Sequence, residues 1–140
     1  MKVFLDANIL VSVLNKEYPL FTYSSRIVSL ADNMRFQIFT SPVCLAIAFY
    51  FAEKKSGAEM AKSKIEMLVK KLSIAVADKA VVESAIQDKK VIDFEDGIEY
   101  YSAIRSKCSC IVTEDLDDFY FAKTEVLSSQ AFLEKYLLPA

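Results

Sequence analysis

The feature that most restricts the fold is a series of short, continuous apolar runs separated by longer stretches with helical spacing. Val3-Phe4-Leu5 and Cys110-Ile111-Val112 are two such runs. Strands that are apolar at every position are buried on both faces, which is typical of a parallel sheet covered by helices. The expected fold class is α/β, a three-layer α/β/α arrangement with a central parallel, doubly wound sheet of about five strands. The expected strands are residues 3–5, 36–39, 74–76, 110–112 and 126–127.

Helices are expected between these strands, and several of their starts carry capping residues. Thr40-Ser41-Pro42 places a hydroxyl before a first-turn proline, and Asp78 and Asp93 precede two further helical stretches. The segment 58–72 is amphipathic, with lysines opposite its apolar face. The expected helices are residues 7–14, 19–31, 42–55, 58–72, 79–87, 94–106 and 129–137.

Length and composition limit the chemistry that is available to the chain. Its 140 residues fit a single domain, 1–140, and 54% hydrophobic residues with only two glycines exclude a disordered or low-complexity protein. The chain has no histidine, which excludes Ser-His-Asp and Cys-His catalysis and imidazole-bound metals. The Cys108-x-Cys110 spacing fits no common zinc site. Acid-base or metal chemistry must therefore rest on carboxylates.

Nothing in the sequence predicts secretion or a membrane span. The first residues are charged already at Lys2 and Asp6, before a signal-peptide core could form. The longest uncharged stretch, 36–52, contains Pro42 and is better explained by a strand, a turn and a buried helix. We expect a soluble, cytoplasmic protein without membrane association, with buried, reduced cysteines.

Acidic residues stand where a parallel α/β sheet places its functional sites, beyond the carboxyl ends of strands. Asp6 follows the first strand directly, Asp115 follows the fourth, and Asp96 begins the helix that leads into the fourth. If those two strands are neighbours, Asp6 and Asp115 lie on adjacent loops. Gathered carboxylates repel one another unless a cation lies between them. Mg²⁺ or Mn²⁺ suits such hard oxygen ligands and can activate water for phosphodiester hydrolysis.

Each acid also has a purely structural interpretation. Asp6 could simply cap the helix that begins at Ala7, and Asp93 could be an N-cap with Asp96 at the capping-box position. Asp96 and Glu99 share a helix face, so either could reach a metal. The acids expected to be solvated or to serve in loops and caps are Glu95, Glu114 and Asp117.

These residues resemble the PIN-domain family, metal-dependent nucleases that include the toxins of many type II toxin-antitoxin systems. The opening signature, a strand running into Asp-x-Asn, is matched by residues 4–10 with Asp6 and Asn8. A later family acid is matched by Asp96. The last signature, a strand into Thr-x-Asp/Asn followed by Asp-Phe, is matched by residues 111–119. The order and spacing of the three motifs carry the resemblance over nearly the whole chain.

The resemblance implies that RNA is cut by a water bound to Mg²⁺ or Mn²⁺, with Asp6, Asp96 and Asp115 as catalytic and metal-binding residues. It also implies a homodimer and, for a toxin, an antitoxin protein that blocks the acidic pocket. The implied supporting residues are Asn8, Asp93, Thr113 and Asp118. Lysines on the basic faces of residues 54–71 could contact phosphates, face a partner protein or simply be solvated. The candidate RNA-binding residues are Lys54, Lys55 and Lys62.

One departure from the family pattern concerns the helix after the second strand. The family commonly places another acid there, usually Glu, whereas residues 41–48 contain no carboxylate and Ile47 stands where the acid is expected. Glu53 is about two turns farther along the helix. The departure implies weakened metal affinity or turnover, or a catalytically silent member of the family.

Three hypotheses about the function follow from these observations. The leading hypothesis is a metal-dependent endoribonuclease, which could be a toxin of a toxin-antitoxin pair. The alternative is a catalytically weakened or inactive PIN-like module that binds RNA or a protein partner. A third class, aspartate-based phosphatases and phosphoacceptor domains, also uses an Asp after the first strand. It is disfavoured because Asn8 stands where such phosphatases have a second Asp, and no suitably placed lysine is identifiable.

Overall fold

A five-stranded parallel sheet forms the centre of the protein, and the computed structural model describes it within residues 1–137. The strand order is β3-β2-β1-β4-β5, and every neighbouring pair is parallel. The doubly wound α/β prediction is confirmed: the first strand lies in the middle, between β2 and β4. The strands are β1 Lys2–Leu5, β2 Gln37–Thr40, β3 Ser73–Ile74, β4 Cys110–Val112 and β5 Glu125–Leu127.

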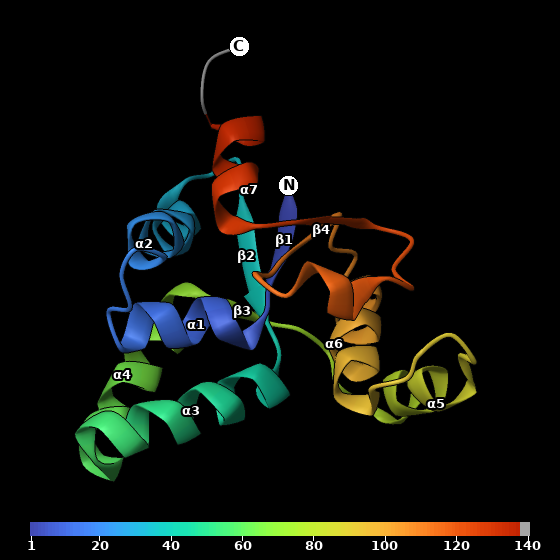
Figure 1. Ribbon diagram of the computed structural model, residues 1–140, viewed down its shortest axis with the longest axis horizontal. Helices are drawn as coiled ribbons and strands as arrows, with labels where there is room; N and C mark the ends of the chain where they lie inside the picture. Colours follow the sequence, from blue (N-terminus) through green and yellow to red (C-terminus); the bar gives the residue numbers. More distant parts are fainter. Residues whose placement is uncertain (138–140) are drawn as a thin grey trace.

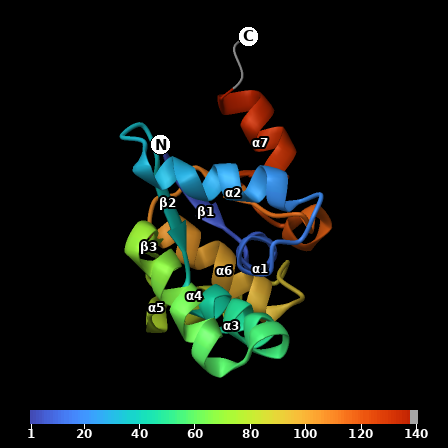
Figure 2. The ribbon, with the colours of Figure 1, turned by 90° about the vertical axis from the view of Figure 1, so that its left-hand side faces the viewer.

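Helices cover both faces of this sheet. Figure 1 shows α1 and α2 to the left of the strands and α5 and α6 to the right. In both ribbon views α3 and α4 lie side by side at the lower end of the molecule (Figures 1 and 2). The helices are α1 Ala7–Leu14, α2 Phe21–Ser29, α3 Pro42–Ser56, α4 Ala58–Lys71, α5 Lys79–Gln87, α6 Phe94–Arg105 and α7 Ser129–Tyr136, with 3₁₀ turns at Leu30–Asp32 and Leu116–Phe119.

The neighbouring strands β1 and β4 are buried along almost their whole length. Val3, Phe4 and Leu5 of β1 have no exposed surface, and neither does any residue of β4. Their continuous apolar runs are therefore explained by helices on both faces. The core also contains all three cysteines, and within the described chain each of them is a free, buried thiol.

Two expected elements have boundaries that differ from the structure by two residues, while the others agree within one. The third strand is Ser73–Ile74 rather than 74–76, because it is an edge strand that pairs only with β2 before the chain turns away. Ile74 and Val76 are each 43% exposed, so this apolar run was not a buried strand. The second helix begins at Phe21, because Pro19 belongs to the turn before it, and its last residues tighten into the 3₁₀ turn that begins at Leu30.

The predicted N-caps of α3, α5 and α6 are confirmed. The Ser41 hydroxyl accepts a hydrogen bond from the backbone N–H of Cys44 at 3.1 Å. Asp93 accepts from the N–H groups of Glu95 and Asp96 at 2.9 and 3.3 Å. Within the described residues Asp96 returns no side-chain hydrogen bond to Asp93, so the capping box is only half formed. The Asp96 carboxylate is therefore free of the cap and can interact with groups outside α6.

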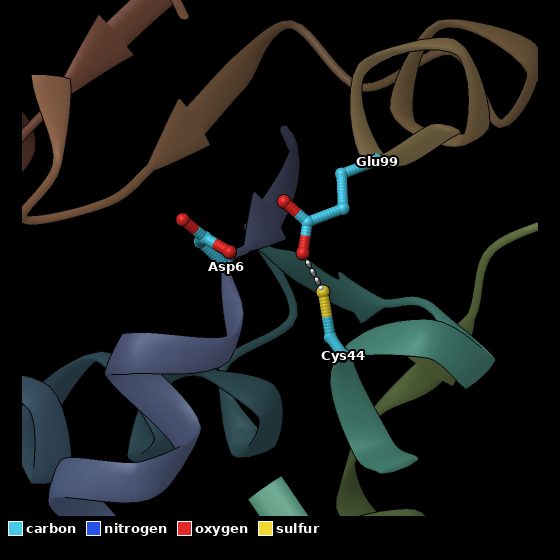
Figure 3. A group of neighbouring side chains, drawn as sticks. All are labelled: Asp6, Cys44 and Glu99. Carbon is cyan, nitrogen blue, oxygen red and sulfur yellow. Dashed lines mark hydrogen bonds between the residues drawn. The ribbon is translucent and has the colours of Figure 1, made fainter. Parts of the chain in front are cut away.

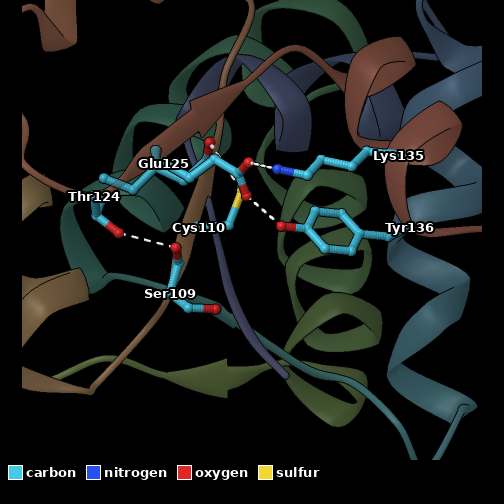
Figure 4. A network of polar contacts seen from close by, with 7 residues as sticks. Ser109, Cys110, Thr124, Glu125, Lys135 and Tyr136 are labelled. Atoms are coloured by element: carbon cyan, nitrogen blue, oxygen red, sulfur yellow. Dashed lines mark hydrogen bonds and ion pairs between the residues drawn. The ribbon is translucent and has the colours of Figure 1, made fainter.

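The last strand is held against the last helix by a polar cluster. Glu125 accepts hydrogen bonds from Lys135 and Tyr136 of α7, as Figure 4 shows. Thr124 donates to the Ser109 carbonyl at 2.9 Å, which ties the start of β5 to the start of β4. These contacts hold the edge strand β5 against β4 and α7. Among the described helices, none has both the length and the apolar character required to cross a bilayer.

Candidate metal site

Asp6 is positioned by the pairing of β1 with β4. The register pairs Leu5 with Val112, and the Asp6 N–H donates to the Val112 carbonyl at 3.0 Å. The next residue of each strand therefore emerges at the same edge of the sheet. Asp6 and Thr113 lie there side by side, and the Thr113 hydroxyl donates to Asp6 Oδ2 at 2.7 Å. Asp6 also caps α1, since its Oδ1 accepts from the Ala7 N–H.

Asn8 links the two loops that follow these strands. Its Nδ2 lies 3.3 Å from Asp6 Oδ2, 3.1 Å from Thr113 Oγ1 and 3.1 Å from Asp115 Oδ2. Its side-chain oxygen accepts from the Glu114 N–H at 3.2 Å. Asp115 is held in turn by a hydrogen bond from its own N–H to Thr113 Oγ1 at 3.0 Å. The amide thus fixes the carboxylates of Asp6 and Asp115 relative to each other.

Asp6, Asp96 and Asp115 line one cavity of about 410 Å³ at this edge of the sheet. Asp118, at the 3₁₀ turn after β4, lines it as well, and one wall is apolar. No lysine or arginine is found among these lining residues, so the cavity attracts cations. The full set is Asp6, Ala7, Asn8, Val11, Glu17, Leu20, Ile47, Phe51, Glu95, Asp96, Asp115 and Asp118.

Two acids of the cavity, Asp96 and Asp118, have raised pKa values. Burial, followed by the charges of Asp93 and Asp118, raises the pKa of Asp96 to about 7. Partial burial and then the charge of Asp115 raise the pKa of Asp118. Crowded carboxylates favour protonation because each ion repels the next. A divalent cation in the cavity would relieve that repulsion.

Several acids outside the predicted ligand set have clear positions. Glu95 is exposed, as expected, and it also lines the cavity next to Asp96. Burial, followed by the charge of Asp93, raises the pKa of Glu95. Glu114 accepts from the Ser129 N–H at the start of α7, which is the structural role expected of it. Asp93 and Asp117 do not line the cavity.

Glu99 is the acid whose position the sequence did not reveal. It is only 1% exposed, although it is a glutamate, and Cys44 Sγ donates to its Oε1 at 2.8 Å. Figure 3 shows its carboxylate reaching from α6 into the space between Asp6 and Cys44. Burial, followed by the charge of Asp6, raises the pKa of Glu99 to about 10. The one available signal was its spacing from Asp96, which places both on one helix face.

Helix α3 brings no carboxylate to this site. The residues it presents are Cys44, which is fully buried, and Ile47 and Phe51, which line the cavity. Burial, followed by the charge of Glu99, raises the pKa of the Cys44 thiol well above its usual value. Glu53 is exposed and does not line the cavity.

The three lysines considered for RNA binding are not gathered around the cavity. Lys55 donates to the Asn15 carbonyl at the end of α1, and the Lys54 ammonium lies 4.3 Å from the centre of the Tyr50 ring. Lys62 is exposed on α4. Contact of these lysines with RNA stays a prediction.

Comparison with known proteins decides the family. A family model described as PIN domain matches residues 2–117. The chain belongs to the PIN-domain family. This PIN domain is 30% identical over 139 residues to Ribonuclease VapC1 of Aquifex aeolicus, with 96% of the chain and 95% of the relative covered.

Solved structures share the fold of this PIN domain. VapBC2 from Rickettsia felis, bound to a promoter DNA fragment, matches with a TM-score of 0.67 and 22% identity, covering 91% of this chain and 98% of the other. VapBC-1 from nontypeable Haemophilus influenzae matches with a TM-score of 0.69 and 16% identity, covering 93% and 99%. The prediction of a PIN-like fold from the three motifs is thus confirmed.

The donor atoms of the cavity suit the divalent metal on which PIN nucleases depend. Asp6, Asp96 and Asp115 offer carboxylate oxygens, the hard ligands that Mg²⁺ and Mn²⁺ prefer. Carboxylate oxygens of Asp6 and Glu99 lie within 4.8 Å of each other, a spacing that one ion can span, and the Cys44 sulfur beside them is a soft donor that such ions do not prefer. The residues therefore fit a hard divalent cation. The assignment of individual ligands stays a prediction.

Proposed function

We propose that this PIN domain, residues 1–140, is an endoribonuclease that uses Mg²⁺ or Mn²⁺ to hydrolyse RNA phosphodiester bonds. The observation that carries the proposal is the convergence of Asp6, Asp96 and Asp115 on one cavity free of basic lining residues. The 30% identity with Ribonuclease VapC1 supports RNA as the substrate. The likeness to the VapBC structures supports a toxin role with an antitoxin protein as the partner, and we place this role in the cytoplasm.

Each proposed ligand has its own structural support. Thr113 and the Ala7 N–H hold Asp6, Asn8 holds Asp115, and the half-formed cap leaves Asp96 facing the cavity. A bound divalent ion would supply a water of lowered pKa and would neutralise charge that develops on the phosphate. The hydrogen bonds already formed keep the carboxylates in place before the substrate arrives.

The apolar wall of the cavity contributes to this function by excluding water. Ile47, Phe51 and Leu20 line the cavity together with the acids and lower the local dielectric constant. Electrostatic interactions between carboxylates and a cation are stronger in such surroundings. The residues that α3 presents to the cavity, Ile47 and Phe51, include no acid. This favours the second candidate function, a PIN module of weakened activity that binds RNA or a protein partner.

Cleavage of a fluorophore-quencher RNA in Mn²⁺ separates the two candidates. We expect the wild type to cut the RNA, EDTA to stop the reaction, and Asp96→Asn to lower the rate at least a hundredfold. The matched control is Asp117→Asn, an acid on the neighbouring loop that does not line the cavity. RNA binding without cleavage by the wild type would favour the weakened module, and full activity of Asp96→Asn would reject the ligand assignment.

A further inference from the structure

Two carboxyl groups are buried next to each other, and one of them, Asp6, lines the acidic cavity. Asp6 is 7% exposed and Glu99 is 1% exposed. One carboxylate oxygen of each residue and the sulfur of Cys44 all lie within 4.8 Å of one another. Figure 3 shows the three side chains converging from the residue after β1, from α6 and from α3. Three separate elements thus bring metal-binding atom types to one point.

The hydrogen bonds to these two carboxylates are unequal. Asp6 receives them from the Ala7 N–H, the Thr113 hydroxyl and the Asn8 amide, so its negative charge is well stabilised. Within the described chain Glu99 receives one, from the Cys44 thiol, which is a weak donor. A buried carboxylate normally requires a cation or several strong donors. Among the described residues, none meets that requirement for an ionised Glu99.

The position of Glu99 on α6 relates it to the proposed ligands. Asp96 and Glu99 are three residues apart, so both project from one face of the helix. Asp96 reaches the cavity, while Glu99 lies one turn deeper, beside Asp6. One helix therefore presents two carboxylates toward Asp6 at different depths. Across from them, α3 presents Cys44 and the apolar Ile47.

We propose that Glu99 is a further ligand of the divalent metal, binding it together with Asp6, and that the Cys44 thiol orients the Glu99 carboxylate. The inference rests on the proposed function, because it takes Asp6 as a member of the metal site. The competing role for Glu99 is structural: a neutral side chain that donates a hydrogen bond to Asp6 and fills the core. Metal binding depends on the negative charge of Glu99 in the first role and does not depend on it in the second.

Titration calorimetry with Mn²⁺ distinguishes these roles without measuring catalysis. Glu99→Gln keeps the size of the side chain and removes its negative charge, and we expect it to weaken Mn²⁺ binding tenfold or more. The Mn²⁺-induced rise in melting temperature should shrink in parallel. The matched control is Glu53→Gln, an exposed glutamate on α3, which should bind Mn²⁺ like the wild type.

Each result has a definite meaning. If Glu99→Gln is folded and binds Mn²⁺ with wild-type affinity, Glu99 is structural and the proposal is overturned while the proposed function stands. If the wild type itself binds no Mn²⁺, the proposed function fails, and the ligand role fails with it. If Glu99→Gln does not fold, Glu99→Asp serves instead. It keeps the charge but withdraws the carboxylate by one methylene, and wild-type affinity in that variant would equally overturn the proposal.

Discussion

The Thr113 hydroxyl donates a hydrogen bond to the Asp6 carboxylate at 2.7 Å, although 107 positions separate the two residues in the sequence. The same Oγ1 accepts from the Asn8 amide and from the Asp115 N–H. Thr113 itself has no exposed surface. One buried hydroxyl therefore holds the first and last proposed ligands in place, and it connects the ends of β1 and β4.

Removal of this hydroxyl should disturb stability and metal binding together. In Thr113→Val the side chain keeps its shape, but Asp6, Asn8 and the Asp115 N–H each lose a partner. We expect a loss of about 1–3 kcal/mol in the free energy of unfolding, measured by urea denaturation, because buried polar groups are left unsatisfied. Mn²⁺ affinity should also fall. Thr113→Ser keeps the hydroxyl and should retain most of both properties, so equal losses in the two variants would contradict this role.

The parts of the fold that local sequence determines could be predicted. Uninterrupted apolar runs indicated β1 and β4, and Ser41, Asp78 and Asp93 indicated the helix starts. The proximity of Asp6 and Asp115 followed from the rule that parallel strands end at a common edge. The strands and helix starts depend on hydrogen bonding and burial within a few residues of the chain, and the proximity of the two acids needs only the general rule in addition.

The parts that depend on tertiary packing could not be predicted in the same way. Helical spacing places Glu99 on the face of Asp96, but it does not give the depth of that face, which depends on how α6 packs against α3. The orientation of Asn8 depends on a loop more than 100 residues away. The edge position of β3 and the cavity-lining position of Glu95 likewise arise only when the elements assemble.

A charge introduced at position 8 should make the protein depend on metal for its stability. Asn8→Asp replaces the amide donor between Asp6 and Asp115 with a third carboxylate. In EDTA we expect the melting temperature to fall, by the equivalent of about 1–3 kcal/mol, because an attraction becomes a repulsion. In Mn²⁺ the variant should gain more in melting temperature than the wild type gains. Asn33→Asp, at a residue remote from the cavity, is the control, and a metal-induced gain no larger than that of the wild type would contradict the expectation.

The packing of α5 and of the loop that follows it against α6 leaves no room for a side chain at position 97. A Cβ at Gly97 would lie 2.6 Å from Val91 Cγ1 and 3.2 Å from the Ala85 Cβ. Alanine normally favours a helix over glycine by about 1 kcal/mol. Here we expect Gly97→Ala to destabilise the protein by about 1–3 kcal/mol instead, since valine is stiff at χ1 and cannot easily move aside.

A double substitution tests that explanation. Val91→Ala removes the methyl group that a Cβ at position 97 would meet first. The combined variant Gly97→Ala with Val91→Ala should therefore lose less stability in urea denaturation than the sum of the two single losses. Simple additivity would show that the contact between these residues is not the cause.

The buried Glu99 should make the metal-free protein less stable as the pH rises. The pKa of Glu99 is about 10 in the folded protein against an ordinary value of 4.5, so between these values the folded state holds a proton that the unfolded state has lost. Its contribution to stability is full below pH 4.5 and is lost as the pH rises toward 10, with a slope of at most about 1.4 kcal/mol per pH unit. Asp96 acts in the same direction up to its pKa of about 7.

Urea denaturation in EDTA between pH 5 and 8 measures the slope of this pH dependence. Because Glu99→Gln cannot lose a proton, its stability should fall less steeply than that of the wild type, and parallel curves for the two proteins would show that Glu99 is already ionised in the folded state at pH 5.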